Sequence, residues 1–149
     1  MQGEPIVVLM AEDDPAHAEI VRRNLEHCRI ANRLEHLVDG QQVLDYLYRR
    51  NAWSDPALSP RPGLILLDLR MPRVDGLEVL KTIKNDSSLA DIPVVILTTS
   101  AAETDIVRAY SFRANSYLVK PLDFEKFSEL INAFGYYWMV WNQTPHPNE

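Results

Sequence analysis

Four short runs of apolar, mostly branched residues constrain the fold of this chain more than any other feature. They cover residues 6–10, 64–67, 94–97 and 117–119, and each leads into polar side chains. Their hydrophobicity is continuous rather than alternating, as is typical of strands in a parallel sheet that is covered on both faces. These runs therefore predict buried parallel strands.

A fifth run, residues 33–38, alternates instead, with Leu34, His36 and Val38 separated by polar neighbours. Alternation of this kind predicts a strand nearer the edge of a sheet. Together the five runs predict one five-stranded sheet.

Five segments that follow the predicted strands have helical periodicity, and several begin at a capping residue or a glycine. They begin at Pro15 behind the cap Asp14, at Gly40, at Gly76, at Glu103 and behind the cap Asp123, and the first continues to about Cys28. The repeated order of strand and helix predicts a doubly wound α/β fold, with a parallel sheet flanked by five helices. Residues 51–63 lack periodicity and are expected to form an exposed loop.

The composition fits one globular domain. The chain has 149 residues, and its 15 basic and 21 acidic side chains give a net charge of −6. This balance argues against broad attraction to nucleic acid or to anionic lipid. A single cysteine excludes an intramolecular disulfide, and the N-terminal apolar run is too short for a signal sequence or a membrane span. We therefore expect a cytoplasmic protein with no direct nucleic-acid or membrane contact.

Polar residues follow the predicted parallel strands at the end where ligands bind in open α/β sheets. They are Glu12, Asp13, Asp68, Thr98 and Lys120. Three carboxylates that meet at one edge repel one another unless a positive group lies among them. Carboxylates and water suit Mg²⁺, whereas zinc would want histidine or cysteine ligands. The pattern therefore predicts a magnesium site.

Asp68 is the best candidate for a nucleophile in this group, because it ends the central strand and precedes an accessible loop at residues 69–72. Beside a metal ion, a carboxylate can attack phosphorus while a lysine and a hydroxyl take up charge on the phosphoryl oxygens. The constellation predicts a phosphoryl-acceptor site.

The motifs in this order resemble the signature of response-regulator receiver domains, which share the fold of the chemotaxis regulator. The resemblance rests on Glu12-Asp13, on residues 68–76 (DLRMPRVDG), on Thr98 and on residues 117–121 (YLVKP), and it spans about residues 6–134. We accordingly expect a receiver domain over residues 1–134 and a separate C-terminal extension over residues 135–149.

The resemblance implies a role for each matching residue. Asp68 would be the aspartate that a histidine kinase phosphorylates. Asp13 and Asp68 would bind Mg²⁺ directly, Glu12 would do so through water, and the carbonyl of Arg70 would complete the set.

It also implies that Lys120 contacts the phosphoryl group and that Pro121 follows a cis peptide bond. Thr98 would donate its hydroxyl to the phosphoryl group. Tyr117 would be the switch aromatic that turns inward on activation. The less favoured alternative is an ordinary half-buried strand residue.

Other residues near the motifs favour structural roles. Asp14 favours a helix cap and Asp75 a turn into the third helix. The four histidines lack metal-ligand spacing, so we expect them to be solvated or structural. Many receivers have Gly-Ala before the last strand, whereas this chain has Arg113 and Ala114, which puts the local backbone there in question.

Aromatic residues concentrate in the C-terminal segment, where Phe134, Trp138 and Trp141 continue the spacing of one apolar helical stripe. An apolar stripe beyond the domain predicts an extended helix or arm that packs on a second copy of the chain in a homodimer. The alternative is that the segment folds back on its own domain, with Gly135 as the hinge.

This aromatic extension, the Leu97-Thr98-Thr99-Ser100 motif and Arg61-Pro62 together resemble the small stand-alone response regulators of bacterial and cyanobacterial phytochromes. The resemblance implies a histidine kinase as partner, such as a phytochrome, and an output through protein contacts rather than an enzyme activity.

Three other functions are open from the sequence. One is a phosphorelay intermediate that passes its phosphoryl group to a histidine protein. Another is a Mg²⁺-dependent phosphatase of the haloacid type, which would want an acid two residues after the nucleophile, where this chain has Arg70. The third is an interaction module with a silent pocket.

Overall fold

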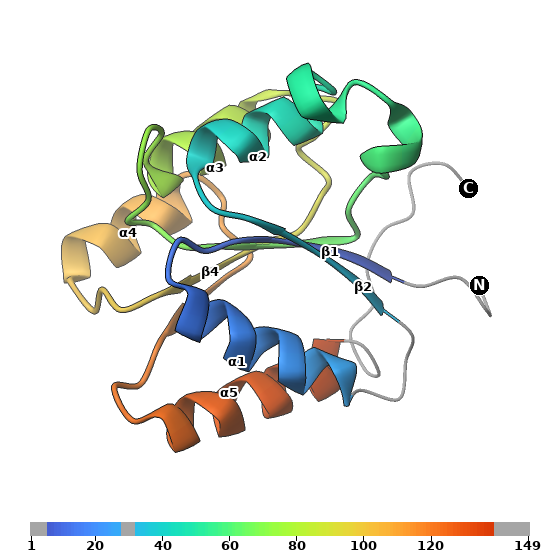
Figure 1. The fold of residues 1–149 in the computed structure, drawn as a ribbon. Helices are drawn as coiled ribbons and strands as arrows, with labels where there is room; N and C mark the ends of the chain where they lie inside the picture. Colours follow the sequence, from blue (N-terminus) through green and yellow to red (C-terminus); the bar gives the residue numbers. More distant parts are fainter. Residues whose placement is uncertain (1–5, 28–31, 139–149) are drawn as a thin grey trace.

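A parallel sheet forms the centre of the computed structural model, which describes residues 6–27 and 32–138 (Figure 1). The sheet has five strands in the order β2-β1-β3-β4-β5, and the predicted fold class is confirmed. Cys28, Trp141 and the tail from Thr144 lie outside the described residues. The strands are β1 (Ile6–Ala11), β2 (Asn32–Leu37), β3 (Leu64–Leu67), β4 (Val94–Thr98) and β5 (Ser116–Val119).

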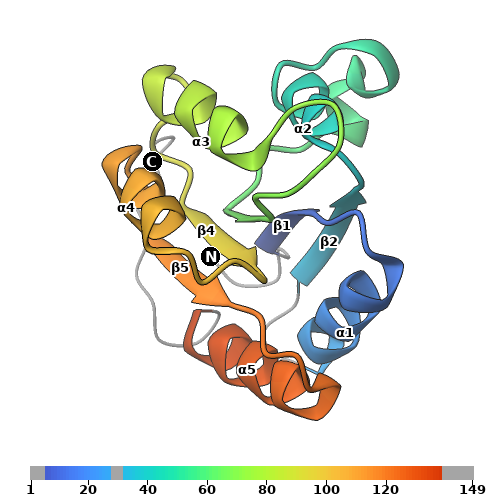
Figure 2. The same cartoon turned by 90° about the vertical axis from the view of Figure 1, so that its left-hand side faces the viewer.

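Two layers of helices cover the sheet, one on each face (Figures 1 and 2). Helices α1 and α5 pack side by side on one face, and α2, α3 and α4 cover the other. The helices are α1 (Pro15–Glu26), α2 (Gly40–Leu47), α3 (Gly76–Asn85), α4 (Glu103–Ser111) and α5 (Phe124–Tyr136). Within the described ranges, the five predicted helices are confirmed.

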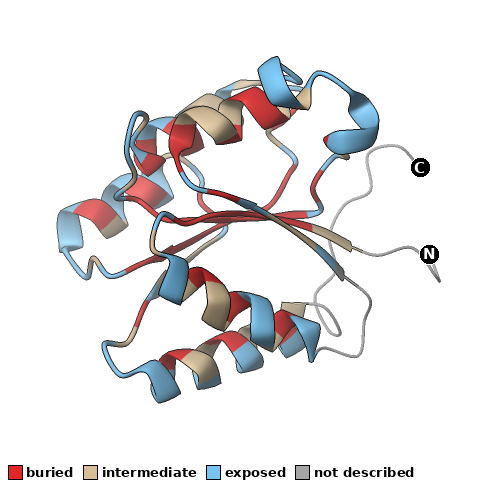
Figure 3. Ribbon diagram, viewed as in Figure 1, coloured by how far each residue is buried: buried red, intermediate tan, exposed pale blue. Residues whose placement is uncertain are grey.

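The strands β3 and β4 are buried along their whole length, and Figure 3 shows the buried middle of the sheet in red. Their side chains alternate between two hydrophobic clusters, one under α2, α3 and α4 and the other under α1 and α5. Burial on both faces explains why these strands read as continuous apolar runs.

The edge strand β2 differs in detail from its prediction. It lies at the edge of the sheet, as expected, but it ends at Leu37, and Leu37 rather than Val38 is buried. Val38 is 44% exposed, because the chain turns there and its N–H donates to the side chain of Gln42. The alternating set Leu34, His36 and Val38 is therefore not the buried set.

Aspartates begin four of the helices. The Asp14 side chain accepts from the N–H groups of Ala16 and His17, and Asp123 caps α5 in the same way, so both predicted caps are confirmed. The caps of α2 and α3 are Asp39 and Asp75. Each carboxylate satisfies backbone donors that a helix leaves unpaired in its first turn.

The loop predicted for residues 51–63 contains two short 3-10 turns, at Asn51–Trp53 and Pro56–Leu58. At the other atypical segment, Arg113 has φ 67°, which is the left-handed conformation that favours glycine. Its guanidinium donates to the carbonyl of Lys84, so the side chain is fixed against α3.

Among the described residues, no helix is both long enough and apolar enough to cross a bilayer.

Gly76 allows the start of α3 to lie directly against the end of β3. Its N–H donates to the Leu69 carbonyl at 2.9 Å. A Cβ at this position would lie 2.2 Å from the carbonyl oxygen of Asp68 and 2.7 Å from the Cα of Leu69. The obstructing atoms are backbone, so a side chain here would displace Asp68 and Leu69, which directly follow β3.

We therefore expect Gly76→Ala to lower the free energy of unfolding by about 2–3 kcal/mol, the upper range for overpacking. Urea denaturation followed by circular dichroism measures this change. Gly63→Ala is the matched control, because a Cβ there meets no heavy atom closer than 3.3 Å. Equal stability of the two variants would contradict the close approach at Gly76.

Candidate functional site

The carboxyl ends of four neighbouring strands carry the candidate site residues. Glu12 directly follows β1, Asp68 follows β3, Thr98 ends β4 and Lys120 follows β5. Each of the three residues beyond a strand donates its N–H to the carbonyl of a neighbouring strand. Glu12 donates to Leu37 at 2.9 Å, Asp68 to Ala11 at 3.2 Å and Lys120 to Thr98 at 2.7 Å. The sheet ladder therefore continues into the site and fixes its backbone.

Three carboxylates meet at this edge. Glu12, Asp13 and Asp68 each place one oxygen so that all three lie within 4.8 Å of one another. Glu12 and Asp68 are buried, with 3% and 7% exposure, whereas Asp13 is exposed. An all-oxygen set with one open side fits a hard divalent cation that keeps part of its water shell.

The ammonium group of Lys120 lies among these acids. Its side chain is 1% exposed, and its Nζ donates to Asp68 Oδ2 at 3.0 Å and to Glu12 Oε1. One buried cation thus faces two buried carboxylates and a third, exposed one. The site keeps an excess of negative charge that a bound cation would offset.

Burial changes the acidity of Glu12. Removal from water raises its pKa from 4.5 to about 7, and the negative charge of Asp68 adds to this rise, while Lys120 opposes it. Glu12 therefore titrates close to neutral pH.

The predicted hydroxyl and aromatic residues lie on the two strands beyond Asp68. Thr98 is fully buried, and its hydroxyl accepts from the Ser100 N–H at 3.4 Å. Tyr117 is half-buried against the α3–α4 side of the core, and its hydroxyl donates to the Ser100 carbonyl at 2.8 Å. Burial raises the pKa of this phenol. Both side chains thus meet the backbone of the loop before α4.

Arg70 joins the loop after Asp68 to the start of α4. Its N–H donates to Asp68 Oδ1 at 3.3 Å, and its guanidinium donates to Asp105 Oδ2 at 2.5 Å. The hydroxyl of Ser100 donates to the same Asp105 oxygen at 2.6 Å. The sequence reasoning did not single out Asp105, because a first-turn acid on a helix has no distinctive spacing.

His17 is the second residue that sequence reasoning did not place at the site. Its Nδ1 lies 3.0 Å from the Nζ of Lys120. Its position could have been predicted from the helix cap. His17 stands three residues after Asp14, and therefore in the turn of α1 that faces the strand ends.

One backbone prediction is wrong. The described residues contain no cis peptide bond, so the bond before Pro121 is trans. The trans form is the intrinsically preferred one even before proline. Lys120 reaches Asp68 and Glu12 with this geometry, so the contacts of the site do not need the cis form.

The aromatic residues predicted to extend beyond the domain lie partly against it. Phe134 and Trp138 are half-buried and pack on the cluster under α1 and α5. Their rings stack with centroids 5.7 Å apart. Tyr136 and Tyr137 are exposed, and Trp141 lies outside the described residues.

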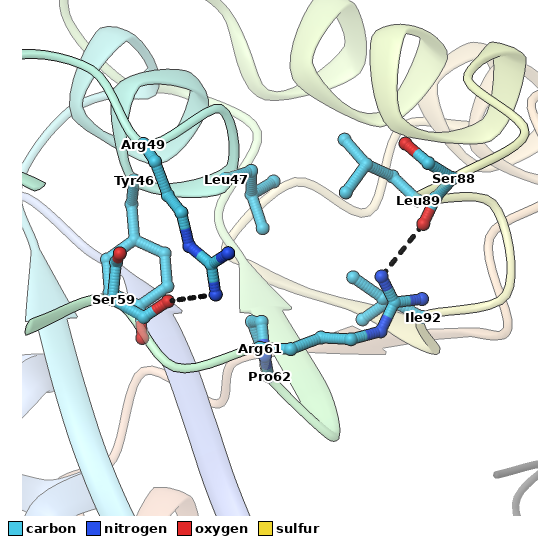
Figure 4. Close-up of a pocket in the computed structure, with 9 residues that line it drawn as sticks. All are labelled: Tyr46, Leu47, Arg49, Ser59, Arg61, Pro62, Ser88, Leu89 and Ile92. Carbon is cyan, nitrogen blue, oxygen red and sulfur yellow. Dashed lines mark hydrogen bonds between the residues drawn. The ribbon is translucent and has the colours of Figure 1, made fainter. Parts of the chain in front are cut away.

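A cavity of about 320 Å³ lies at the opposite ends of the strands, beside the segments that precede β3 and β4 (Figure 4). Arg49 and Arg61 line it, and they donate to the carbonyls of Ser59 and Ser88. No carboxylate or histidine is among its lining residues. The acid–lysine cluster is therefore the stronger candidate for chemistry.

Comparison with known proteins decides the family. The model of the response regulator receiver domain matches residues 8–132. The chain belongs to this family. Receiver domains are components of two-component signalling, and the acids, threonine and lysine described above lie at the ends of neighbouring strands of this one.

Two relatives match this receiver over most of their length. It is 44% identical over 144 residues to "Probable methanogenesis regulatory protein FilR2" of Methanothrix harundinacea, covering 97% of this chain and 90% of that protein. It is 36% identical over 135 residues to the response regulator Rcp1 of Synechocystis sp., covering 91% and 90%.

Solved response regulators, one of them a phytochrome response regulator, have the same fold. The Mn²⁺-bound form of Rcp1 superposes with a TM-score of 0.91 at 35% identity, covering 95% of this receiver and 100% of that chain. The phosphorylated cyanobacterial phytochrome response regulator RcpA has a TM-score of 0.90 at 29% identity, covering 96% and 100%. The predicted similarity to phytochrome response regulators is therefore confirmed.

The raised pKa of Glu12 predicts that the effect of Glu12→Gln on the free energy of unfolding depends on pH. Between pH 4.5 and about 7 the folded receiver holds a proton on Glu12 that the unfolded chain has lost, so rising pH lowers stability. Glu12→Gln does not titrate, and its stability relative to the parent should be higher at pH 8 than at pH 5. Urea denaturation at both pH values measures this, and an equal difference at the two would contradict the raised pKa.

Proposed function

We propose that this receiver accepts a phosphoryl group from the phosphohistidine of a histidine kinase onto Asp68, with Mg²⁺, and signals through protein contacts. The observation that carries the proposal is the contact of the buried Lys120 ammonium with Asp68 beside two further acids. A phosphoryl acceptor needs a carboxylate nucleophile and fixed positive charge next to it.

The transfer forms one bond to phosphorus and breaks another. An oxygen of Asp68 bonds to phosphorus while the bond from phosphorus to the imidazole nitrogen of the kinase breaks, and that nitrogen keeps the electron pair. The Nζ of Lys120 lies 3.0 Å from Asp68 Oδ2, so its ammonium can stabilise the negative charge on the phosphoryl oxygens after transfer. Thr98, at the end of the neighbouring strand, is the hydroxyl donor in this proposal.

The residues that would hold Mg²⁺ are Asp13 and Asp68 directly, Glu12 through water and Arg70 through its carbonyl. When bound, Mg²⁺ would supply positive charge that stabilises negative charge developing on the phosphoryl group. The all-oxygen donor set and its excess of negative charge support this assignment. The Mn²⁺-bound form of the relative Rcp1 supports it as well.

The response to phosphorylation would pass through the loop before α4. Thr98 and Tyr117 both bond to Ser100 in this loop, so a pull on the Thr98 hydroxyl acts on the segment that anchors the Tyr117 ring. Such a shift changes the surface formed by α4 and β5, which partner proteins can read.

Similarity to phytochrome response regulators supports a sensor histidine kinase, such as a phytochrome, as the phosphodonor. The chain has a higher identity to a probable methanogenesis regulatory protein. This similarity favours including histidine kinases other than phytochromes among the candidate phosphodonors. A phosphorelay intermediate uses the same site. A haloacid-type phosphatase is disfavoured, because Arg70 stands where the second acid is needed and pairs with Asp105.

Incubation with Mg²⁺ and a small acyl phosphate should add one phosphoryl group to the chain, because Asp68 is the nucleophile. Asp68→Asn should gain none, and omission of Mg²⁺ should slow the reaction strongly. Intact-mass spectrometry measures the addition, and acid lability identifies an acyl phosphate. Thr82→Val is a control away from the site, on α3, where the Thr82 hydroxyl donates to the carbonyl of Glu78. Equal labelling of Asp68→Asn would contradict the assignment.

The C-terminal extension is the proposed self-association surface, through Phe134, Trp138 and Trp141. Phe134 and Trp138 keep part of their surface exposed although they pack on the core, and Tyr136 and Tyr137 are 52% and 55% exposed. A second copy could cover this aromatic surface.

Sedimentation should give the full chain twice the mass of one chain, and a chain shortened to residues 1–134 should sediment as a monomer. The control is Val107→Ser on α4, which removes an apolar side chain of 57% exposure outside the extension and should leave the mass unchanged. Equal masses of full and shortened chains would mean that the extension is not the interface.

A further inference from the structure

His17 makes the third contact of the Lys120 ammonium, and nothing in the phosphoryl-transfer scheme above uses it. Lys120 is 1% exposed, so each of its three N–H donors needs a protein partner. Glu12 and Asp68 accept two of them. An ammonium group only donates, so the Nδ1 of His17, at 3.0 Å, is the acceptor for the third.

The imidazole is fixed in place from two sides. Its ring packs edge-on against the fully buried Phe127 of α5, with centroids 5.4 Å apart, and against Phe124 at 6.2 Å. Its Nε2 points toward the Asp14 carboxylate at 3.6 Å. With Nδ1 as acceptor, the neutral ring carries its proton on Nε2, on the side of Asp14.

The charges around His17 favour this neutral form. Burial and the positive charge of Lys120 lower the pKa of the imidazole, whereas Asp14, Asp68 and Asp13 raise it, and the net direction is down. Because its pKa is lowered, the ring is neutral at physiological pH, and its Nδ1 keeps a lone pair that accepts from Lys120.

We propose that His17 is a positioning residue, which holds the Lys120 ammonium at Asp68 through a neutral acceptor and so sets the rate of phosphoryl acceptance. The inference deepens the proposed function and rests on it. Without a third acceptor, one N–H of Lys120 would be unpaired. A carboxylate at this place would satisfy it but would add a fourth negative charge beside the incoming phosphoryl group. A neutral imidazole avoids that repulsion.

Two isosteric variants separate positioning from packing. His17→Asn keeps an acceptor oxygen on the Cγ atom, where histidine has Nδ1, whereas His17→Leu keeps the apolar contact with Phe127 and removes the acceptor. Positioning predicts that Asn retains the phosphorylation rate and that Leu slows it on the order of ten-fold, the lower range for groups that support a site residue. A packing role predicts the reverse order.

The rates are measured by intact mass with Mg²⁺ and a small acyl phosphate, and urea denaturation checks that both variants are folded. Labelling of His17→Leu at the parent rate, or of His17→Asn as slowly as His17→Leu, would overturn the inference.

A second measurement does not depend on phosphorylation. In ¹⁵N spectra of the unphosphorylated full chain at neutral pH, His17 should carry its proton on Nε2, and Lys120→Met should shift the Nδ1 resonance. A proton on Nδ1, or an Nδ1 resonance that Lys120→Met leaves unchanged, would overturn the inference. If the expected spectra accompany a parent chain that takes no phosphoryl group, the proposed function fails while the contact between His17 and Lys120 stands.

Discussion

The burial of the Lys120 ammonium between Glu12 and Asp68 is the interaction on which the site depends. An ion pair removed from water holds only if its geometry is good and its remaining donors are satisfied, and loss of one partner leaves an uncompensated charge that costs about 3–5 kcal/mol. The backbone therefore has to be fixed. The N–H groups of Glu12, Asp68 and Lys120 all bond to neighbouring strands, so the sheet itself sets the spacing of the three charges.

A second buried lysine, Lys84, has neutral partners and so differs from Lys120, whose ammonium contacts carboxylates. Lys84 on α3 is 7% exposed, and it donates to the carbonyls of Ala90 and Ile92 and to the side chain of Asn115. Burial is the main cause that lowers its pKa. Lys84 is thus satisfied by neutral oxygens and ties α3 to the segments before β4 and β5. Lys120 instead faces carboxylates, and its charge lies directly beside the candidate nucleophile Asp68.

The sequence was informative wherever one local rule determined the structure. Burial on both faces produces continuous apolar strands, so β3 was predicted with its observed bounds, and the helix caps Asp14 and Asp123 followed from side-chain chemistry. The polar strand ends then placed Glu12, Asp13, Asp68 and Lys120 together, because parallel strands end at one edge.

What the sequence did not predict depends on contacts between distant segments. The contact of His17 with Lys120 joins the first turn of α1 to the end of β5, and the contact of Arg70 with Asp105 joins the loop after β3 to the first turn of α4. The cap at Asp14 places His17 in the turn that faces the strand ends, but it does not specify the contact with Lys120, and no spacing in the chain encodes the pairing of Arg70 with Asp105. The burial of Leu37 in place of Val38 depends on where β2 ends. The bond before Pro121 has the intrinsically preferred trans form, whereas the family resemblance implied the cis form.

The two helical layers contact the site in different ways, and this division bears on how it can be regulated. On the α3–α4 side, Arg70, Asp105 and Ser100 form a polar chain from Asp68 to the carbonyl that holds Tyr117. On the α1–α5 side, the link is aromatic: Phe127 packs against His17 and belongs to the same cluster as Phe134 and Trp138. A partner that moves α4 would act on the phosphoryl pocket through hydrogen bonds. A partner that covers the C-terminal aromatic residues would act through the packing that fixes His17, and so through the position of Lys120.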